Sequence, residues 1–181
     1  YHERLFEYRV GERVFDQIDA VVRKLKAVPH TRRAQAVTWQ VWNDLEIDDP
    51  ACLQRMWFRI SGGKLHLNVH FRSNDAFKAA FMNIYAFTEL QREVAAKVGV
   101  EPGEYIHLAD SFHIYGSYFD DFEGFLASVR SRSFEERVYT EAFAREIFVE
   151  GCDMLLAEPD MPESKKQLVR RRREVLLGPG A

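Results

Sequence analysis

The sequence predicts one α+β domain that covers residues 1–181. Three observations lead to this prediction. Apolar residues recur with helical spacing in several long stretches. Residues 64–72 alternate strictly between apolar and polar side chains, as a strand with one buried face does. Helical and strand patterns follow one another without an internal repeat or a linker, and 181 residues with 46% hydrophobic content are enough for one buried core.

The N-terminal third is predicted to hold a helix and a β-rich segment. Apolar residues follow helical spacing over residues 14–25, and the pattern stops before Pro29. Residues 34–42 are β-rich, and the acidic stretch over residues 43–50 is turn-like.

The middle of the chain is predicted to form a hairpin, a long helix and a further strand. Residues 56–60 and 64–72 alternate in polarity around a Gly62-Gly63 turn. A helix is predicted from Asp75 to about Val98, with Gly99 as its C-cap. The remaining predicted elements are a turn at Pro102-Gly103, a strand over residues 105–115, and helices near residues 118–129, 139–156 and 161–177.

Composition excludes several classes of function. Charged residues make up 29% of the chain but the net charge is only −3, which gives no case for nucleic acid or an anionic membrane as a partner. No apolar stretch is long enough to cross a bilayer, and no signal-peptide pattern is present. Two cysteines a hundred residues apart, Cys52 and Cys152, predict reduced thiols in a cytoplasmic protein. The histidines have no metal-binding spacing, so no metal site is predicted.

Cys52 is the candidate nucleophile. It lies at a junction between a loop and a strand, with Arg55, Arg59 and Arg72 available to lower its pKa. A thiolate adds readily to C6 of a pyrimidine, and this addition makes C5 carbanion-like. The alternative is a buried, unreactive thiol, which is common for a lone cysteine.

Other polar residues are candidates for binding a nucleotide. Arg72 and Ser73, at the end of a strand and the start of a helix, form a pattern suited to phosphate, and Arg32 and Arg33 add two cations. Asn83 lies on a predicted helix whose other face is apolar, where a buried carboxamide needs a hydrogen-bonding partner.

Three more polar residues are candidates for the site, and each of them also suits a purely structural role. Asp75 could serve as a helix N-cap. His113 and Tyr115, two positions apart on a predicted strand, project to one face and could form a hydrogen-bonded pair of rings.

The segments Pro50-Ala51-Cys52, Arg72-Ser73-x-Asp75, Asn83 and His113-Ile114-Tyr115 together resemble the core signature of the thymidylate synthases and their sister pyrimidine-nucleotide hydroxymethylases. The resemblance runs from Arg32 to Tyr115. Leu53 replaces the histidine that usually follows the cysteine, and the C-terminal half departs from the common form, as in a divergent, short branch. The resemblance implies a mixed β-sheet with packed helices, dimerisation through a sheet face, and an N-terminal segment that is missing from these residues.

The resemblance also implies roles for individual residues. It makes Cys52 the nucleophile and assigns Arg72 to both the thiol and the phosphate. It implies a homodimer in which Arg32 and Arg33 reach the phosphate in the partner's site. The other implied roles are a phosphate contact for Ser73, a catalytic contact to the folate pterin for Asp75, recognition of the pyrimidine by Asn83, contacts to the ribose 3′ hydroxyl by His113 and Tyr115, and movement of the C5 proton by Tyr1. The stretch before His113 is one residue longer than usual, so either Asp110 or Ser111 takes the usual aspartate place.

The implied activity is transfer of a one-carbon unit from 5,10-methylenetetrahydrofolate to C5 of a pyrimidine nucleoside monophosphate. Asn83 favours dUMP and methylation to dTMP. The alternative within the family is a 5-hydroxymethylase acting on CMP or dCMP, and the sequence does not decide between ribose and deoxyribose. A nucleotide-binding relative without turnover would have no use for Cys52, and a thiol protease would need a histidine base that the spacing does not supply.

Overall fold

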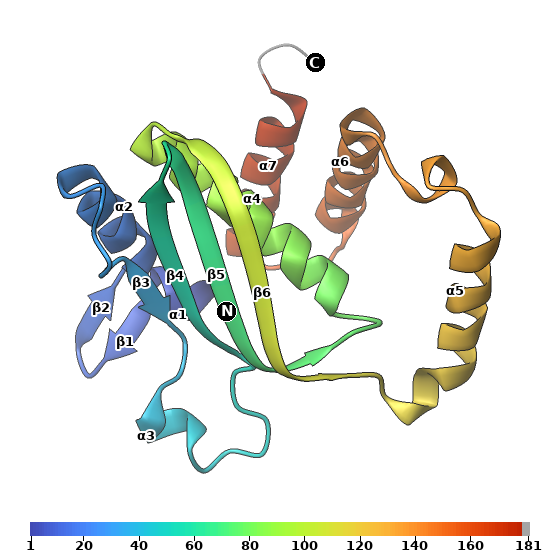
Figure 1. Ribbon diagram of the computed structural model, residues 1–181, viewed down its shortest axis with the longest axis horizontal. Coiled ribbons are helices and arrows are strands. Elements are labelled where there is room, and N and C mark those ends of the chain that lie inside the picture. The colour runs from blue at the N-terminus through green and yellow to red at the C-terminus, as the bar shows by residue number, and fades with distance from the viewer. Residues whose placement is uncertain (179–181) are drawn as a thin grey trace. The chain divides into compact units, whose positions relative to one another are not determined.

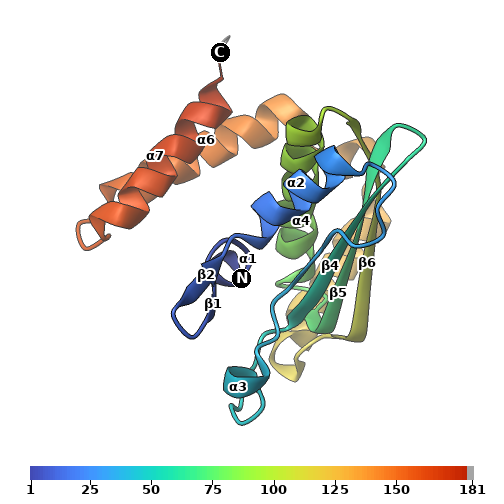
Figure 2. The same cartoon turned by 90° about the vertical axis from the view of Figure 1, so that its left-hand side faces the viewer.

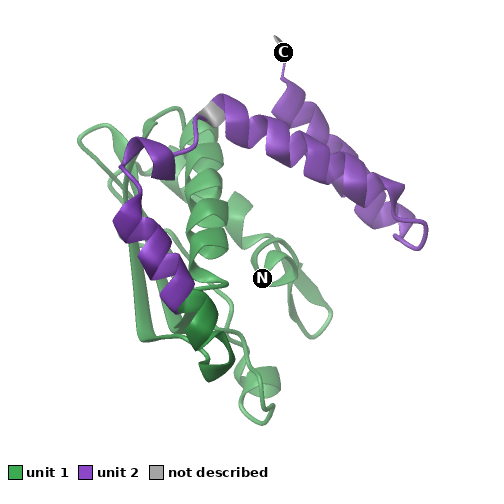
Figure 3. Cartoon of the chain, turned by 90° about the vertical axis from the view of Figure 1, so that its right-hand side faces the viewer, with its two compact units in different colours: residues 1–122 green, residues 123–181 purple. Residues whose placement is uncertain are grey.

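The computed structural model describes residues 1–178, apart from the side chain at position 141. The chain divides into two compact units, residues 1–122 and residues 123–181 (Figure 3). The prediction of one domain over residues 1–181 stays a prediction.

The first unit is built on a four-stranded mixed sheet in the order β3-β4-β5-β6 (Figure 1). The strands are β3 (Gln35–Val37), β4 (Leu53–Ser61), β5 (Lys64–Asp75) and β6 (Glu101–His113). The pairs β3–β4 and β4–β5 are antiparallel, whereas β5 and β6 are parallel. The predicted fold class, an α+β fold with a mixed sheet and packed helices, is therefore confirmed.

The predicted hairpin between β4 and β5 is confirmed. Ser61 pairs with Lys64, and Gly62 and Gly63 between them have φ values of 57° and 75°. Two consecutive positive φ angles suit the right-handed twist of a two-residue hairpin turn, and glycine adopts them without steric cost.

Two helices, α2 (Gln17–Ala27) and α4 (Ala80–Val98), lie on one side of this sheet (Figure 2). The alternation of β5 explains the core, because every second side chain of this strand points toward these helices. The fully buried residues that β5 contributes are Leu65, Leu67, Val69 and Phe71, and the two helices contribute Ile18, Val21, Leu25 and Val94.

The first predicted helix does not begin at Val14, as its apolar spacing had indicated. Asp16 caps α2 by accepting a hydrogen bond from the backbone N–H of Asp19 at 2.8 Å, so Val14 lies outside the helix. Val14 belongs to β2 (Arg13–Phe15), which pairs with β1 (Tyr8–Val10) in a separate two-stranded sheet after the short helix α1 (His2–Phe6).

The segment predicted to be β-rich over residues 34–42 contains only the three residues of β3. It continues into a helical turn, α3 (Val41–Asp44). Asp44 explains the turn, because its carboxylate accepts a hydrogen bond from the backbone N–H of Gln40 at 2.7 Å.

The ends of β5 and β6 also differ from the prediction. β5 continues to Asp75, which pairs with His113, so α4 begins at Ala80 and not at Asp75. Pro102-Gly103 lies inside β6 and is not a turn; a proline is tolerated there because β6 is an edge strand. β6 ends at His113, which leaves Tyr115 beyond the strand.

The predicted C-terminal helices are confirmed as α5 (Phe119–Ser131), α6 (Glu141–Ala157) and α7 (Glu163–Leu177). In the second unit α6 and α7 pack together, and Arg173 donates from Nε to the Asp153 carboxylate at 2.6 Å. Within residues 1–178, no helix combines the length and the apolar character needed to traverse a bilayer.

Candidate active site around Cys52

Arg72 holds the loop that leads into Cys52. Its guanidinium donates to the carbonyl oxygens of Ala51, at 3.3 Å from Nε, and of Pro50, and it lies 3.5 Å from the Asp49 carboxylate. The backbone N–H of Arg72 donates to the carbonyl of Cys52 at 2.8 Å. Arg72 therefore fixes the position of the partly buried thiol at the start of β4 and keeps a cation close to it.

Tyr1 lies beside the same thiol. Burial raises the pKa of the Tyr1 phenol above its ordinary value, and the electrostatic interaction with the neighbouring Cys52 raises this pKa further. The Tyr1 ring packs edge-on against Phe71, with 6.0 Å between the ring centroids, and lies 6.3 Å from the Phe87 ring. The phenol therefore keeps its proton at neutral pH and can donate it in a hydrogen bond near sulfur.

The parallel pairing of β5 and β6 brings two further predicted segments together. Ser73 pairs with Ser111, and Asp75 pairs with His113, at the carboxyl ends of both strands. Asp75 Oδ1 accepts hydrogen bonds from the backbone N–H groups of Phe77 at 2.8 Å and Lys78 at 3.2 Å. These bonds close the turn that precedes α4, whose N-cap is Ala79, so the structural alternative of a helix N-cap is wrong. The second carboxylate oxygen of Asp75 has no donor among residues 1–178.

His113 contacts both Ser111 and Tyr115. The Ser111 hydroxyl lies 3.3 Å from His113 Nδ1, and the rings of His113 and Tyr115 pack edge to face with 4.9 Å between centroids. Asp110 instead hydrogen-bonds His70 Nε2 at 2.9 Å. Asp110 and Ser111 were the two candidates for the position before His113 at which the resembling family usually has an aspartate. Of these two residues, Ser111 is the one beside His113.

Asn83 has a partner that the sequence did not reveal. Its Nδ2 donates to Asn74 Oδ1 at 2.7 Å, and Asn74 is buried. Asn74 stands between Ser73 and Asp75, at the position left variable in the predicted motif. The signal in the sequence was that a buried carboxamide at Asn83, on a predicted helix with an apolar face, needs a hydrogen-bonding partner; it did not show which residue that partner is.

Arg32 and Arg33 do not join this cluster within one chain. The carbonyl of Arg32 accepts from Trp57 Nε1 at 3.1 Å, and the carbonyl of Ala34, two residues on, accepts from Phe58 N at 2.9 Å. These arginines therefore lie about five residues along β4 from Cys52, or about 16 Å at the rise of a strand. Their role in a partner's site stays a prediction.

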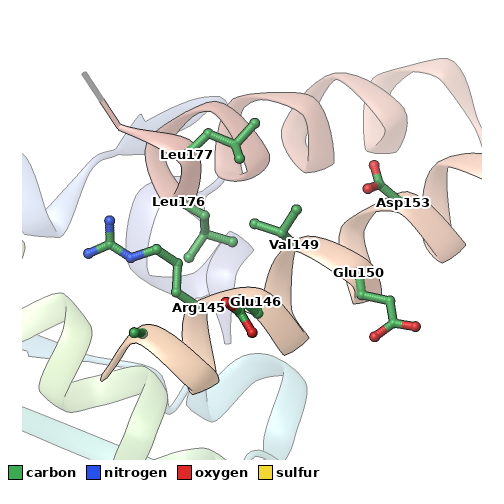
Figure 4. Close-up of a pocket in the computed structure, with 8 residues that line it drawn as sticks. Arg145, Glu146, Val149, Glu150, Asp153, Leu176 and Leu177 are labelled. Carbon is green, nitrogen blue, oxygen red and sulfur yellow. The ribbon is translucent and has the colours of Figure 1, made fainter. Parts of the chain in front are cut away.

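A hollow of about 710 Å³ lies between α6 and α7 in the second unit (Figure 4). Val149, Leu176 and Leu177 line it together with Arg145 and the carboxylates of Glu146, Glu150 and Asp153. It contains none of the predicted site residues, and Asp153 is already paired with Arg173.

Residues 1–178 contain no cluster of three or more histidine, cysteine, aspartate or glutamate side chains that could hold a metal ion. The predicted lack of a metal stays a prediction.

Comparison with known proteins gives the family. The family model described as thymidylate synthase matches residues 1–173. A Methanocaldococcus jannaschii protein named as a candidate thymidylate synthase is 42% identical over 120 residues, which are 64% of this chain and 54% of that protein. A Methanosarcina barkeri protein with the same name is 38% identical over 130 residues, or 68% of this chain and 60% of that protein.

A bacterial thymidylate synthase, from Leuconostoc mesenteroides, is 32% identical over 110 residues, which are 61% of this chain and 34% of that protein. The chain spans little more than half the length of the two archaeal relatives.

Proposed function

Because this chain belongs to the thymidylate synthase family, we propose that it transfers a one-carbon unit from 5,10-methylenetetrahydrofolate to C5 of a pyrimidine nucleoside monophosphate, converting dUMP to dTMP. The observation that carries this proposal is the cluster of Tyr1, Cys52 and Arg72 beside the carboxyl ends of β5 and β6. Cys52 supplies a nucleophile, Tyr1 a proton donor and Arg72 a cation. Ser73, next to Arg72, completes the predicted phosphate-binding pattern.

The nucleotide is held mainly by groups on the first unit. The guanidinium of Arg72 and the hydroxyl of Ser73 bind the phosphate, while His113 and Tyr115, already in ring contact, hold the ribose. Asn83 reads the base. These contacts orient C6 of the ring toward sulfur.

The thiolate of Cys52 then adds to C6, and the electron pair moves to C5. Methylenetetrahydrofolate supplies the one-carbon unit and, for methylation, the hydride. The free carboxylate oxygen of Asp75 can accept a hydrogen bond from a pterin N–H, which makes this residue suitable for orienting the folate. The Tyr1 hydroxyl, next to sulfur, helps move the C5 proton.

In the proposed homodimer, the partner chain supplies Arg32 and Arg33 as two further cations of the phosphate site. The face of the sheet opposite α2 and α4 carries apolar side chains that are half exposed, with Ile106 at 51% and Leu108 at 54%. Pairing two such faces would bury this surface, and Arg32 and Arg33 of one chain would then complete the phosphate site of the other. The two thiols are free, as expected for a cytoplasmic protein.

Replacing the sulfur tests the covalent step. The intact protein is incubated with methylenetetrahydrofolate and either dUMP, dCMP or CMP, and the product is weighed by mass spectrometry. Cys52→Ser should abolish product while nucleotide binding remains, because a hydroxyl is a far poorer nucleophile than a thiolate at neutral pH. Cys152→Ser, a change of the other thiol in α6 of the second unit, is the matched control and should keep full turnover. Unchanged turnover in Cys52→Ser would end the covalent proposal.

The same experiment separates the alternative within the family. A hydroxymethyl gain on a cytosine nucleotide would identify a hydroxymethylase, in which water replaces hydride at the last step. Binding of a nucleotide without any product would indicate a non-catalytic relative.

A further inference from the structure

The Asn74–Asn83 pair has a fixed direction. A backbone carbonyl can only accept a hydrogen bond, and the carbonyl of Asp75 lies 3.3 Å from Asn74 Nδ2. The NH₂ end of Asn74 therefore faces this carbonyl, and its oxygen faces Asn83. Only the NH₂ end of Asn83 can then meet it, at 2.7 Å.

Reversing either amide would cost free energy. Turning Asn83 around would place its oxygen against the oxygen of Asn74, and turning both would place the oxygen of Asn74 against the Asp75 carbonyl. Asn74 is only 3% exposed, so water cannot easily repair either mismatch. A buried polar group without its partner costs about 1–3 kcal/mol in proteins.

This direction determines what Asn83 offers to a ligand. One N–H of its amide is taken by Asn74, which leaves Oδ1 as an acceptor and the second N–H as a donor, in a fixed order along the free edge. Uracil presents N3–H, which can donate to Oδ1 of Asn83, and O4, which can accept from the free N–H of Asn83. Cytosine presents N3 and the 4-amino group, which require the opposite order.

We propose that Asn74 is a specificity-determining positioning residue: by locking the amide of Asn83 in one orientation, it makes the site accept a uracil ring and reject a cytosine ring. The proposal rests on the proposed function, in which Asn83 reads the base. Asn74 itself does not touch the substrate.

The test measures the dissociation constants of dUMP and dCMP for the full chain by isothermal titration calorimetry. The readout is the ratio of the dCMP constant to the dUMP constant, because general damage to the site weakens both nucleotides alike. Asn74→Leu keeps the approximate size of the side chain but removes the acceptor, so Asn83 can turn. A two-contact amide–base pair discriminates by about ten-fold or more, and this preference for dUMP should be lost.

Two further variants sharpen the result. Asn74→Asp keeps an acceptor facing Asn83 and should retain the preference within about three-fold: a carboxyl buried against the Asp75 carbonyl is protonated, its O–H donates to that carbonyl, and its other oxygen accepts from Asn83. Asn43→Leu, an equivalent change in α3 away from the pair, should leave the ratio unchanged. Should Asn74→Leu fail to fold, Asn74→Ala removes the same acceptor with less crowding.

The outcomes distinguish the two proposals. A wild-type protein that binds neither nucleotide would refute the proposed function, and this inference with it. A wild-type preference for dUMP that survives unchanged in Asn74→Leu or Asn74→Ala, or disappears in Asn74→Asp, would overturn the inference and leave the proposed function standing.

Discussion

The buried ion pair between Arg4 and Asp44 should contribute strongly to the stability of the first unit. Asp44 is 1% exposed, and its two carboxylate oxygens accept from both terminal nitrogens of Arg4, at 2.7 Å for Nη2. The same carboxylate accepts from the backbone N–H of Gln40. The pair joins α1, which directly follows Tyr1, to α3, which lies ahead of Cys52.

Asp44→Asn removes the negative charge and at least one good acceptor. Breaking a buried pair by removing one partner costs about 3–5 kcal/mol. The Arg4 side chain is 21% exposed and can recover part of its hydration, so we expect a loss of about 3 kcal/mol in the free energy of unfolding.

The pair also predicts a pH dependence. The hydrogen bonds from Arg4 lower the pKa of Asp44 below its ordinary value. A carboxylate with a depressed folded-state pKa stabilises fully above its unfolded pKa of about 4, and this stabilisation is lost as the pH falls through the lower folded pKa. The difference between wild type and Asp44→Asn should therefore be constant from about pH 5 to 8 and shrink in acid.

Urea unfolding followed by tryptophan fluorescence measures this difference. The three tryptophans of the chain, Trp39, Trp42 and Trp57, all lie in the first unit, so the signal reports its unfolding. Asp19→Asn is the control, because Asp19 pairs with Arg23 on the surface and should contribute less than about 1 kcal/mol. A loss in Asp44→Asn no larger than that of the control, or a difference that grows in acid, would refute the reasoning.

Two more changes test the core and the helix end. Phe58→Ala empties a fully buried site in β4 and should cost about 3–5 kcal/mol in urea unfolding, whereas Phe81→Ala, at an exposed position, should cost much less; equal losses would place Phe58 outside the core. Gly99→Ala should lower the melting temperature followed by circular dichroism, because Gly99 caps α4 at φ +85° and a side chain there costs about 1 kcal/mol. Gly124→Ala, inside α5 and with open space around it, should not lower it.

Local patterns were enough to predict much of the first unit. The alternation of β5 and the two glycines of its hairpin depend on neighbouring residues, so the strand, its buried face and the turn all followed from the sequence. The start of α2 was mispredicted because an apolar residue, Val14, continued the helical spacing past the true cap at Asp16.

Features that depend on distant residues were not predictable. Asp75 has the sequence character of a helix cap, yet pairing with β6 keeps it in a strand. Pro102 was read as part of a turn because nothing local shows that its strand lies at an edge of the sheet. The candidate site shows the same difference: Cys52 and Arg72 could be named as candidates from the sequence, whereas the contact between Asn74 and Asn83 needs the fold of α4 over β5.

The parallel pairing of β5 with β6 also sets an order of events during folding. Its paired residues are about 38 positions apart, as in Asp75 and His113, with all of α4 between them. The hairpin of β4 and β5 closes through a two-residue turn, and local pairings of this kind form faster than distant ones. In a growing chain the β4–β5 hairpin, which brings Arg72 to the loop before Cys52, can thus form before β6 pairs with β5.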